Sequence, residues 1–261
     1  MTGPLPTDDS GRGAGTPSCG AAAEPAFATA IIVAGGTGER LGLPGGKQLA
    51  EVAGRPVLSW SVAAFDASPL VDNIVVVCHP DRLAEYRAAA VESLGLATPV
   101  SFAAGGSTRQ ASVASGLEQV RENAALVLVH DGARPLVTPA LIAETLAALE
   151  ADSSADGAIV GQPVVDTLKV VDGHTIAETA DRTRFWAVQT PQAFRAIPLR
   201  AAYAAASADG FLGTDDASLV ERAGGRVLVV EGPRDNIKVT VAEDLVLVEA
   251  ALRFRTEGGR R

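Results

Sequence analysis

Residues 28–49 read ATAIIVAGGTGERLGLPGGKQL, and this stretch decides the fold class. Its first seven residues, 28–34, are small or apolar and β-branched residues are frequent among them, which predicts a buried strand. The loop that follows contains Gly35, Gly36 and Gly38 and ends at Lys47. Glycines allow backbone N–H groups to approach phosphate oxygens closely. A buried strand that runs directly into such a loop is typical of α/β proteins that bind ligands beyond the carboxyl ends of their strands.

The chain beyond this loop alternates between strand and helix patterns. Apolar runs predict strands at 72–79, 98–106 and 125–135. Helical spacing of apolar residues predicts helices at 55–68, 81–95, 108–120 and 138–150. Thr138 suits an N-cap and Pro139 suits the first helical position. Continuous apolar strands that alternate with amphipathic helices predict a parallel sheet covered on both faces. We therefore expect an α/β fold that is Rossmann-like and doubly wound, with a mostly parallel sheet.

This alternation changes at 157–194, where short β segments follow one another. Asp172 and Gly173 predict a tight turn between two arms of a hairpin, at 169–171 and 175–177. The segment has too few apolar residues to form its own core, so we expect it to pack on a second subunit. The remaining patterns predict two helices, a strand and a last helix, at 194–209, 215–224, 225–232 and 241–254.

The length of 261 residues allows one large domain with a generous core. Residues 1–26 are rich in Gly, Pro, Ala and Ser, and they predict a disordered extension rather than a secretory signal or transit peptide. Residues 27–254 form the predicted domain. Residues 255–261 are predicted to be a flexible C-terminal tail.

Composition excludes several classes of protein. A formal net charge of −9 argues against non-specific binding to nucleic acid or to an anionic membrane, so a nucleotide site must be a local cluster of Arg and Lys. No apolar run approaches the roughly 18 residues that span a bilayer. Cys19 and Cys78 suggest neither a disulfide framework nor a thiolate metal site. These features predict a cytoplasmic protein.

The glycine loop fits neither of two common nucleotide motifs. A P-loop requires G-x-x-x-x-G-K-[ST], but Gln48 follows Lys47 and Leu41 occupies the position of the first glycine. The same Leu41 breaks the G-x-G-x-x-G fingerprint of dinucleotide-binding enzymes. What remains is a glycine loop with two cations, Arg40 and Lys47. Such charges suit a triphosphate that is attacked at its α-phosphorus.

A second glycine loop, GGSTRQAS at 105–112, follows the third predicted strand. Gly105 and Gly106 permit close backbone approach, and the start of the following helix favours anions. Arg109 and Ser112 are three residues apart and therefore share one face of the first helical turn. The loop is a candidate part of the same ligand site.

The loop VHDGARP at 129–135 ends another buried strand. Asp131 is placed where a carboxylate commonly holds Mg²⁺, a hard cation that prefers carboxylate and phosphate oxygens. Arg134 could bind phosphate bidentately. His130 is equally compatible with a structural and with a functional role. No cluster of His and Cys suggests zinc.

Two later loops add further cations and hydroxyls. The stretch 180–194 holds Arg182 and Thr190, and the stretch 232–245 holds Lys238 shortly before a helix that is capped near Thr240. By itself, Lys238 would be interpreted as a surface lysine. His79 and His174 have no visible partners in the sequence, and we interpret them as structural or surface groups.

Taken together, these loops resemble the 2-C-methyl-D-erythritol 4-phosphate cytidylyltransferase family of the non-mevalonate isoprenoid pathway. The matching motifs, in chain order, are AGGTGERL with KQ, GGSTRQASV, VHDGARP, DTLK, TPQAF, TDDASLVE and DNIKVT. They cover about residues 28–253. Members of this family join CTP to a sugar-alcohol phosphate, release pyrophosphate and need Mg²⁺ or another divalent cation.

The resemblance implies a role for each matching residue. Ser112 would contact the base, and Asp131 would contact the ribose and help to place Mg²⁺. Nucleotide binding is implied for Ala34, Gly35, Gly36, Gly38, Gly105, Gly106, Arg109, Ser112 and Asp131. Substrate binding is implied for Arg134, Thr167, Arg182, Thr190, Thr214 and Lys238. Catalysis is implied for Arg40, Lys47, Arg182 and Lys238.

The resemblance also implies an assembly. Family members are homodimers whose protruding β-arm reaches into the partner's site, and the arm here would be about 161–186. Two positions depart from the usual family pattern, Gly46 in place of Pro before the loop lysine and Gly132 in place of Ala. Neither departure removes a charged group, so they bear on loop closure rather than on the reaction.

Two alternative functions remain open at this point. A D-ribitol-5-phosphate cytidylyltransferase would share the fold, the CTP site and the reaction type, and it would differ in the acceptor. A non-catalytic nucleotide-binding or dimerisation module is the other alternative. The presence of Lys47, Asp131 and Lys238 argues against the second.

Overall fold

Strand β1 (Ala28–Val33) lies inside a seven-stranded sheet, and the computed structural model describes residues 3, 28–36 and 46–258. The strand order is β11-β7-β10-β6-β1-β4-β5. The other six strands are β4 (Asn73–Cys78), β5 (Val100–Ala104), β6 (Leu126–Asp131), β7 (Gly157–Pro163), β10 (Trp186–Arg195) and β11 (Val227–Glu231). Only β10 runs antiparallel to its neighbours, and the remaining pairs of this sheet are parallel. The predicted mostly parallel sheet is confirmed.

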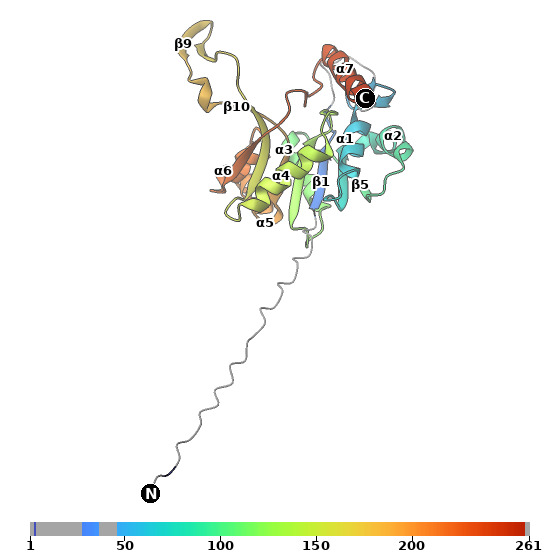
Figure 1. Ribbon diagram of the computed structural model, residues 1–261, viewed down its shortest axis with the longest axis horizontal. Helices are drawn as coiled ribbons and strands as arrows, with labels where there is room; N and C mark the ends of the chain where they lie inside the picture. Colours follow the sequence, from blue (N-terminus) through green and yellow to red (C-terminus); the bar gives the residue numbers. More distant parts are fainter. Residues whose placement is uncertain (1–2, 4–27, 37–45, 259–261) are drawn as a thin grey trace.

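Helices cover both faces of this sheet (Figure 1). One face carries α1 (Val57–Asp66), α2 (Leu83–Ala90) and α4 (Pro139–Ala151), and the other carries α3 (Arg109–Glu118), α5 (Ala196–Asp209) and α6 (Asp216–Arg222). Side chains alternate between the faces along each strand, so Ile32 joins the first core and Ile31 the second. The doubly wound arrangement is therefore confirmed, and it gathers the strand carboxyl ends along one edge.

The last helix differs from its prediction. Helix α7 (Ala242–Gly258) packs beside the small hairpin of β2 (Glu51–Val52) and β3 (Arg55–Pro56). The predicted flexible tail from 255 onward is wrong at its start, because Arg255 is still helical. Its guanidinium donates to the Leu136 carbonyl at 2.9 Å and pairs with Asp235 at 2.8 Å. Apart from Gly3, the predicted extension 1–26 lies outside the described residues.

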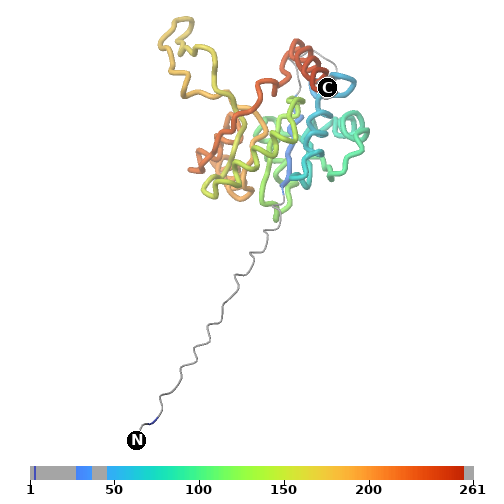
Figure 2. The backbone as a smooth tube through the Cα atoms, viewed as in Figure 1, coloured from blue at the N-terminus to red at the C-terminus, as the bar shows by residue number. Residues whose placement is uncertain are grey.

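The insertion between β7 and β10 forms an arm that extends away from the sheet, as the backbone tube in Figure 2 shows. It contains a separate antiparallel hairpin, β8 (Lys169–Asp172) and β9 (Thr175–Thr179), followed by the short helix η4 (Arg182–Arg184). The predicted hairpin is confirmed, with Gly173 at φ 59° in its turn. Large apolar side chains of the arm are exposed, namely Val165, Val170, Val171, Ile176 and Phe185.

The other differences from prediction are small. The helix predicted at 81–95 is divided into η2 (Pro80–Arg82), α2 and η3 (Glu92–Leu94), and it ends at Gly95 as expected, with φ 62°. Within the described ranges, none of the helices combines the length and the apolar character that crossing a membrane requires.

Candidate active site

The loops singled out in the sequence meet at the carboxyl edge of the sheet, around a cavity of about 550 Å³. Its lining comes from the ends of β1, β5 and β6 and from the segment before α7. The predicted site residues that line it are Gly35, Gly36, Lys47, Gly105, Gly106, Arg109, Ser112, Asp131 and Lys238. Ala34 is fully buried at the end of β1, beside this cavity. Gly38 and Arg40 lie outside the described residues.

One wall of this cavity is built by backbone that only glycine permits. A Cβ on Gly105 would lie 3.2 Å from the Cys78 carbonyl oxygen and 3.2 Å from Ser112 Oγ. A Cβ on Gly106 would lie 2.5 Å from the Cβ of Ala111, which is closer than real Cβ contacts. The loops after β1 and β5 can therefore approach each other around Ser112. The sequence predicted that these glycines allow a ligand to approach the backbone closely, and this stays a prediction.

Ser112 fixes the second glycine loop to the start of α3. Its hydroxyl accepts from the Gly106 N–H at 3.1 Å and donates to the Thr108 carbonyl at 2.9 Å. Thr108 is the N-cap of α3, where its side chain accepts from the Ala111 N–H at 3.0 Å. The loop geometry is thus set before a ligand binds.

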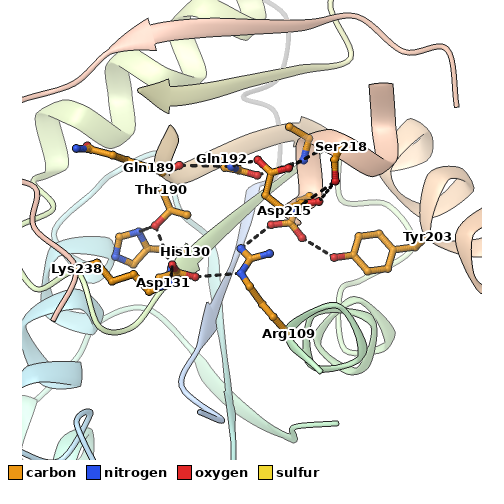
Figure 3. Close-up of polar contacts among 12 residues, drawn as sticks. Arg109, His130, Asp131, Gln189, Thr190, Gln192, Tyr203, Asp215, Ser218 and Lys238 are labelled. Carbon is orange, nitrogen blue, oxygen red and sulfur yellow. Dashed lines mark hydrogen bonds and ion pairs between the residues drawn. The ribbon is translucent and has the colours of Figure 1, made fainter. Parts of the chain in front are cut away.

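Arg109, Asp131 and Lys238 line the cavity and form a cluster of ion pairs, whose side chains are drawn in Figure 3. The Asp131 carboxylate receives Arg109 Nε on Oδ1 at 3.1 Å and Lys238 Nζ on Oδ2 at 2.6 Å. Burial by itself would raise the pKa of Asp131, but the neighbouring positive charges of Arg109 and Lys238 outweigh it and hold that pKa well below its usual range. Asp131 is therefore an anion at neutral pH, and it does not act as a proton acceptor.

His130 lies next to this cluster, and its ring nitrogens contact groups of the protein itself. We therefore interpret it as a structural residue. The Thr190 hydroxyl accepts from the Asp131 N–H and contacts His130 Nδ1, both at 3.0 Å, and His130 Nε2 lies 3.2 Å from the Arg134 carbonyl. The imidazole is fully buried, so its surroundings favour the neutral form. Burial lowers the pKa of His130 to about 3. The question that the sequence left open is answered by these contacts.

His130 predicts how stability depends on pH. Its folded-state pKa of about 3 lies below the ordinary value of 6.5, so between these pH values the unfolded chain binds more protons. We expect the contribution of His130 to the free energy of unfolding to have its full value above pH 6.5. The free energy of unfolding should then fall steadily as the pH is lowered to 4. Urea unfolding at several pH values checks this. The variant His130→Gln should lose much of the slope between pH 4 and 6.5, and an unchanged slope would contradict the assignment.

A second cavity of about 440 Å³ adjoins the first. Arg109, Asp131 and Lys238 line both cavities. The second cavity is also lined by three residues predicted to bind the substrate, Arg134, Thr190 and Thr214. The ion-pair cluster therefore stands at the junction of two sites, and a group bound in one can reach a group bound in the other.

Two predicted residues are not brought to this junction. Thr167 and Arg182 are exposed on the arm, and neither of them lines either of these two cavities. Gly46 and Gly132, the two departures from the family pattern, have structural reasons. Gly46 has φ 74°, which proline cannot adopt, and a Cβ on Gly132 would lie 2.9 Å from Leu58.

The sequence patterns did not identify two functional candidates, Asp216 and Tyr203. Asp216 is fully buried and its Oδ2 lies 2.7 Å from Arg109 Nη2, while the Tyr203 hydroxyl donates to its other oxygen. The only sequence signal was the acidic pair in TDDASLVE. That signal does not show which acid faces inward, nor that its partner lies 107 residues away.

The described part of the site does not form a protein-built metal cage. Among the described residues, no group of three or more His, Cys, Asp or Glu side chains is arranged to hold a metal ion. Asp131 is the only acidic side chain on the described lining of the first cavity. Mg²⁺ is commonly bound by one or two carboxylates together with substrate phosphates and water. The donor set fits an ion that a phosphate-bearing ligand brings with it.

Comparison with known proteins points to one family. The family model for 2-C-methyl-D-erythritol 4-phosphate cytidylyltransferase (IspD) matches residues 28–254. Proteins of that name from Geobacter metallireducens and Syntrophotalea carbinolica are 42% and 44% identical, over 86% and 85% of this chain and 97% and 94% of theirs.

Solved structures agree as well. The crystal structure of 2-C-methyl-D-erythritol 4-phosphate cytidylyltransferase from Thermus thermophilus has a TM-score of 0.70 and 36% identity, covering 87% of this chain and 99% of that one. The 4-diphosphocytidyl-2C-methyl-D-erythritol synthase from Anaerococcus prevotii has a TM-score of 0.77 and 30% identity, covering 88% and 100%. The chain therefore belongs to the 2-C-methyl-D-erythritol 4-phosphate cytidylyltransferase family.

Proposed function

We propose that this enzyme transfers the cytidylyl group of CTP to 2-C-methyl-D-erythritol 4-phosphate and releases pyrophosphate. The observation that carries the proposal is the pair of adjoining cavities with Arg109, Asp131 and Lys238 at their junction. A nucleotide in the first cavity and an acceptor in the second would place their phosphates beside the same cations. The names of the relatives favour this acceptor over D-ribitol 5-phosphate.

The first cavity suits a nucleotide. The glycine wall around Gly35, Gly105 and Ser112 offers backbone groups at close range for the edge of a base. Lys47 and Lys238 line the same cavity and carry the positive charge that a triphosphate requires. The overall charge of the chain is −9, so this local cationic lining is what attracts the nucleotide.

The chemistry needs placement and charge neutralisation rather than a general base. A phosphate oxygen of the acceptor attacks the α-phosphorus of CTP, the new P–O bond forms, and the bond to pyrophosphate breaks with the electron pair leaving on pyrophosphate. A phosphate monoester is already nucleophilic at neutral pH. Lys238 and Lys47 stabilise the negative charge that spreads over the reacting phosphates. This agrees with Asp131 being held as an anion between two cations.

We also propose that CTP enters with Mg²⁺ and that Asp131 supplies a protein carboxylate near the ion. A carboxylate has about four lone-pair sites, so Asp131 can accept a further ligand beside Arg109 and Lys238. The ion would neutralise charge on the triphosphate when it is bound.

A homodimer is the assembly that we propose. A second subunit would cover the exposed apolar side chains of the arm. Thr167 and Arg182 lie on the arm and line neither of the two cavities described above in their own chain. In a dimer, the arm of one subunit would bring these two residues to the second cavity of the other. This assembly keeps their predicted role in acceptor binding.

Charge placed on the arm should separate the subunits. We expect Ile176→Asp, at a side chain that is 59% exposed, to convert a dimer to a monomer in size-exclusion chromatography with light scattering. Turnover should fall with it, because the arm residues no longer reach an acceptor. Val246→Asp on α7 is the control, since that side chain is 69% exposed on the main domain. A dimer that is unchanged by Ile176→Asp would contradict the proposed interface.

The experiment that tests the function is pyrophosphate release with CTP and Mg²⁺. Turnover with 2-C-methyl-D-erythritol 4-phosphate and not with D-ribitol 5-phosphate is the expected result. Turnover with D-ribitol 5-phosphate alone would show that this compound is the acceptor, and the proposal for the CTP site would stand. Binding of CTP without release from either acceptor would contradict the proposed reaction.

The glycine wall gives a prediction about nucleotide affinity. Gly106→Ala places a Cβ 2.5 Å from the Cβ of Ala111, so the loop has to shift away from the start of α3, and this changes the wall of the nucleotide cavity. We expect the KM for CTP to rise by at least about tenfold, with a smaller change in the KM for the acceptor. Steady-state kinetics with each substrate varied in turn measures both. Gly54→Ala on an exposed turn is the control, and it should leave the KM for CTP unchanged. Alanine is strained at the φ of 79° that Gly54 adopts, so the stability of both variants is measured by unfolding.

We propose a cytosolic location because Cys78 is a free thiol. This thiol is free and fully buried, and burial raises its pKa to about 11, so it behaves as a small apolar side chain. Such a thiol suits a reducing compartment. Fractionation of the source cells with an antibody to the chain tests the location.

A further inference from the structure

We propose that Asp216 is a positioning residue of the reaction: it holds Arg109 so that Arg109 binds only one oxygen of Asp131 and leaves the other to Lys238. This inference rests on the proposed function, because the group being positioned is the junction at which the two substrates would meet. Nothing in the sequence motif assigned a role to Asp216.

The contacts of Arg109 carry the proposal. An arginine presents Nε and Nη2 along one edge, and this edge commonly binds both oxygens of a single carboxylate. Here the edge is divided between two carboxylates: Nε donates to Asp131 Oδ1 at 3.1 Å and Nη2 donates to Asp216 Oδ2 at 2.7 Å. The Asp131 Oδ2 atom is therefore free to receive Lys238 Nζ at 2.6 Å. Without Asp216, Nη2 would be free to bind Asp131 as well, where it would share Oδ2 with Lys238 and change the position of both cations.

Asp216 itself is fixed on its other side. Its side chain is 0% exposed, and its Oδ1 accepts from the Tyr203 hydroxyl of α5. A carboxylate with each oxygen bound by a different partner has one orientation available. Arg109, whose side chain is 28% exposed, faces the cavity on one side and this fixed acid on the other.

The backbone that carries Asp216 is tied to the sheet. Asp215 caps α6 through the Ser218 N–H at 3.0 Å, in a capping box. Gln192 of β10, which is 1% exposed, donates to Asp215 Oδ2 at 2.9 Å and accepts from the Ala217 N–H at 3.3 Å. The start of α6 is therefore held on both sides of Asp216. These contacts fix the position of the Asp216 carboxylate, which in turn fixes the position of the Arg109 guanidinium.

The first test is a spectroscopic one that does not depend on turnover. In ¹H–¹⁵N spectra of the full-length protein, the Arg109 Nε–H signal is assigned by its absence in Arg109→Lys. We expect Asp216→Asn to shift and broaden this signal, and Tyr203→Phe to shift it less. Asp209→Asn, which breaks the exposed Asp209–Arg222 pair, is the matched control and should leave the signal unchanged. An unchanged signal in Asp216→Asn would overturn the proposal.

The second test is kinetic. With CTP and 2-C-methyl-D-erythritol 4-phosphate, we expect Asp216→Asn to lower kcat by about 10-fold to 100-fold, and Tyr203→Phe to lower it less. The concentration of folded enzyme is measured for each variant, so that a loss of stability is not counted as a loss of rate. A folded Asp216→Asn with kcat within twofold of the parent would overturn the positioning role. If the parent enzyme itself shows no turnover, the proposed function fails, while the Arg109 signal still decides the geometry.

Discussion

Replacement of Lys238 by methionine lowers kcat/KM by about 100-fold to 1000-fold, the largest loss of activity that we expect from a single substitution. Two causes act together. The substitution removes a cation from the junction of the two cavities, where both substrates bring negative charge. It also leaves Asp131 Oδ2 without its partner at 2.6 Å, so an uncompensated carboxylate then faces the phosphates. Methionine keeps most of the length of the side chain, so the main change is the loss of the charged ammonium group.

The measurement is steady-state pyrophosphate release with both substrates varied. The KM for each phosphate-bearing substrate should rise and kcat should fall. Arg253→Met is the control, because Arg253 is 70% exposed in an i,i+4 pair with Glu249 on α7 and its removal should leave the rate unchanged. A Lys238→Met enzyme within fivefold of the parent would exclude Lys238 from transition-state stabilisation.

The fold was predictable because its signals are local. The run Ala28–Val33 is buried on both faces, so it contains no polar stripe, and that pattern already indicates a central parallel strand. Thr138 and Pro139 mark the start of α4 by chemistry that acts within one turn. The end of α7 was missed because no glycine or proline stops it before Gly258. Arg255 is held there by Leu136 and Asp235, which are distant in sequence.

The site was predictable as a set of loops but not as a set of contacts. Parallel strands place their carboxyl ends at one edge, so the loops that hold Arg109, Asp131 and Lys238 had to meet. Which atoms pair depends on how α3, β6 and the segment before α7 pack. The buried partner Asp216 could not be predicted, since an acid at the start of a helix usually has a simpler explanation as a cap. Its neighbour Asp215 does serve as that cap.

Replacement of Arg109 by methionine should cost the largest amount of stability, about 3–5 kcal/mol. Arg109 is the shared cation of two acids, Asp216 at 0% exposure and Asp131 at 12%. Burial by itself would lower the pKa of Arg109, but the charges of Asp216 and Asp131 outweigh it and raise that pKa, so the guanidinium is charged throughout the stable range of pH. Removing it leaves one fully buried carboxylate paired only with a tyrosine hydroxyl.

Urea unfolding at pH 7 measures this loss, and a matched arginine shows that it comes from burial. Arg222→Met on α6 removes the same group from an exposed pair with Asp209, where the expected cost is about 1 kcal/mol or less. Adding Asp216→Asn to Arg109→Met should recover part of the lost stability, because the uncompensated charge is then gone. Equal losses for Arg109→Met and Arg222→Met would contradict the view that a buried acid depends on Arg109. The expected order follows from desolvation, since water screens the Arg222 pair and cannot reach Asp216.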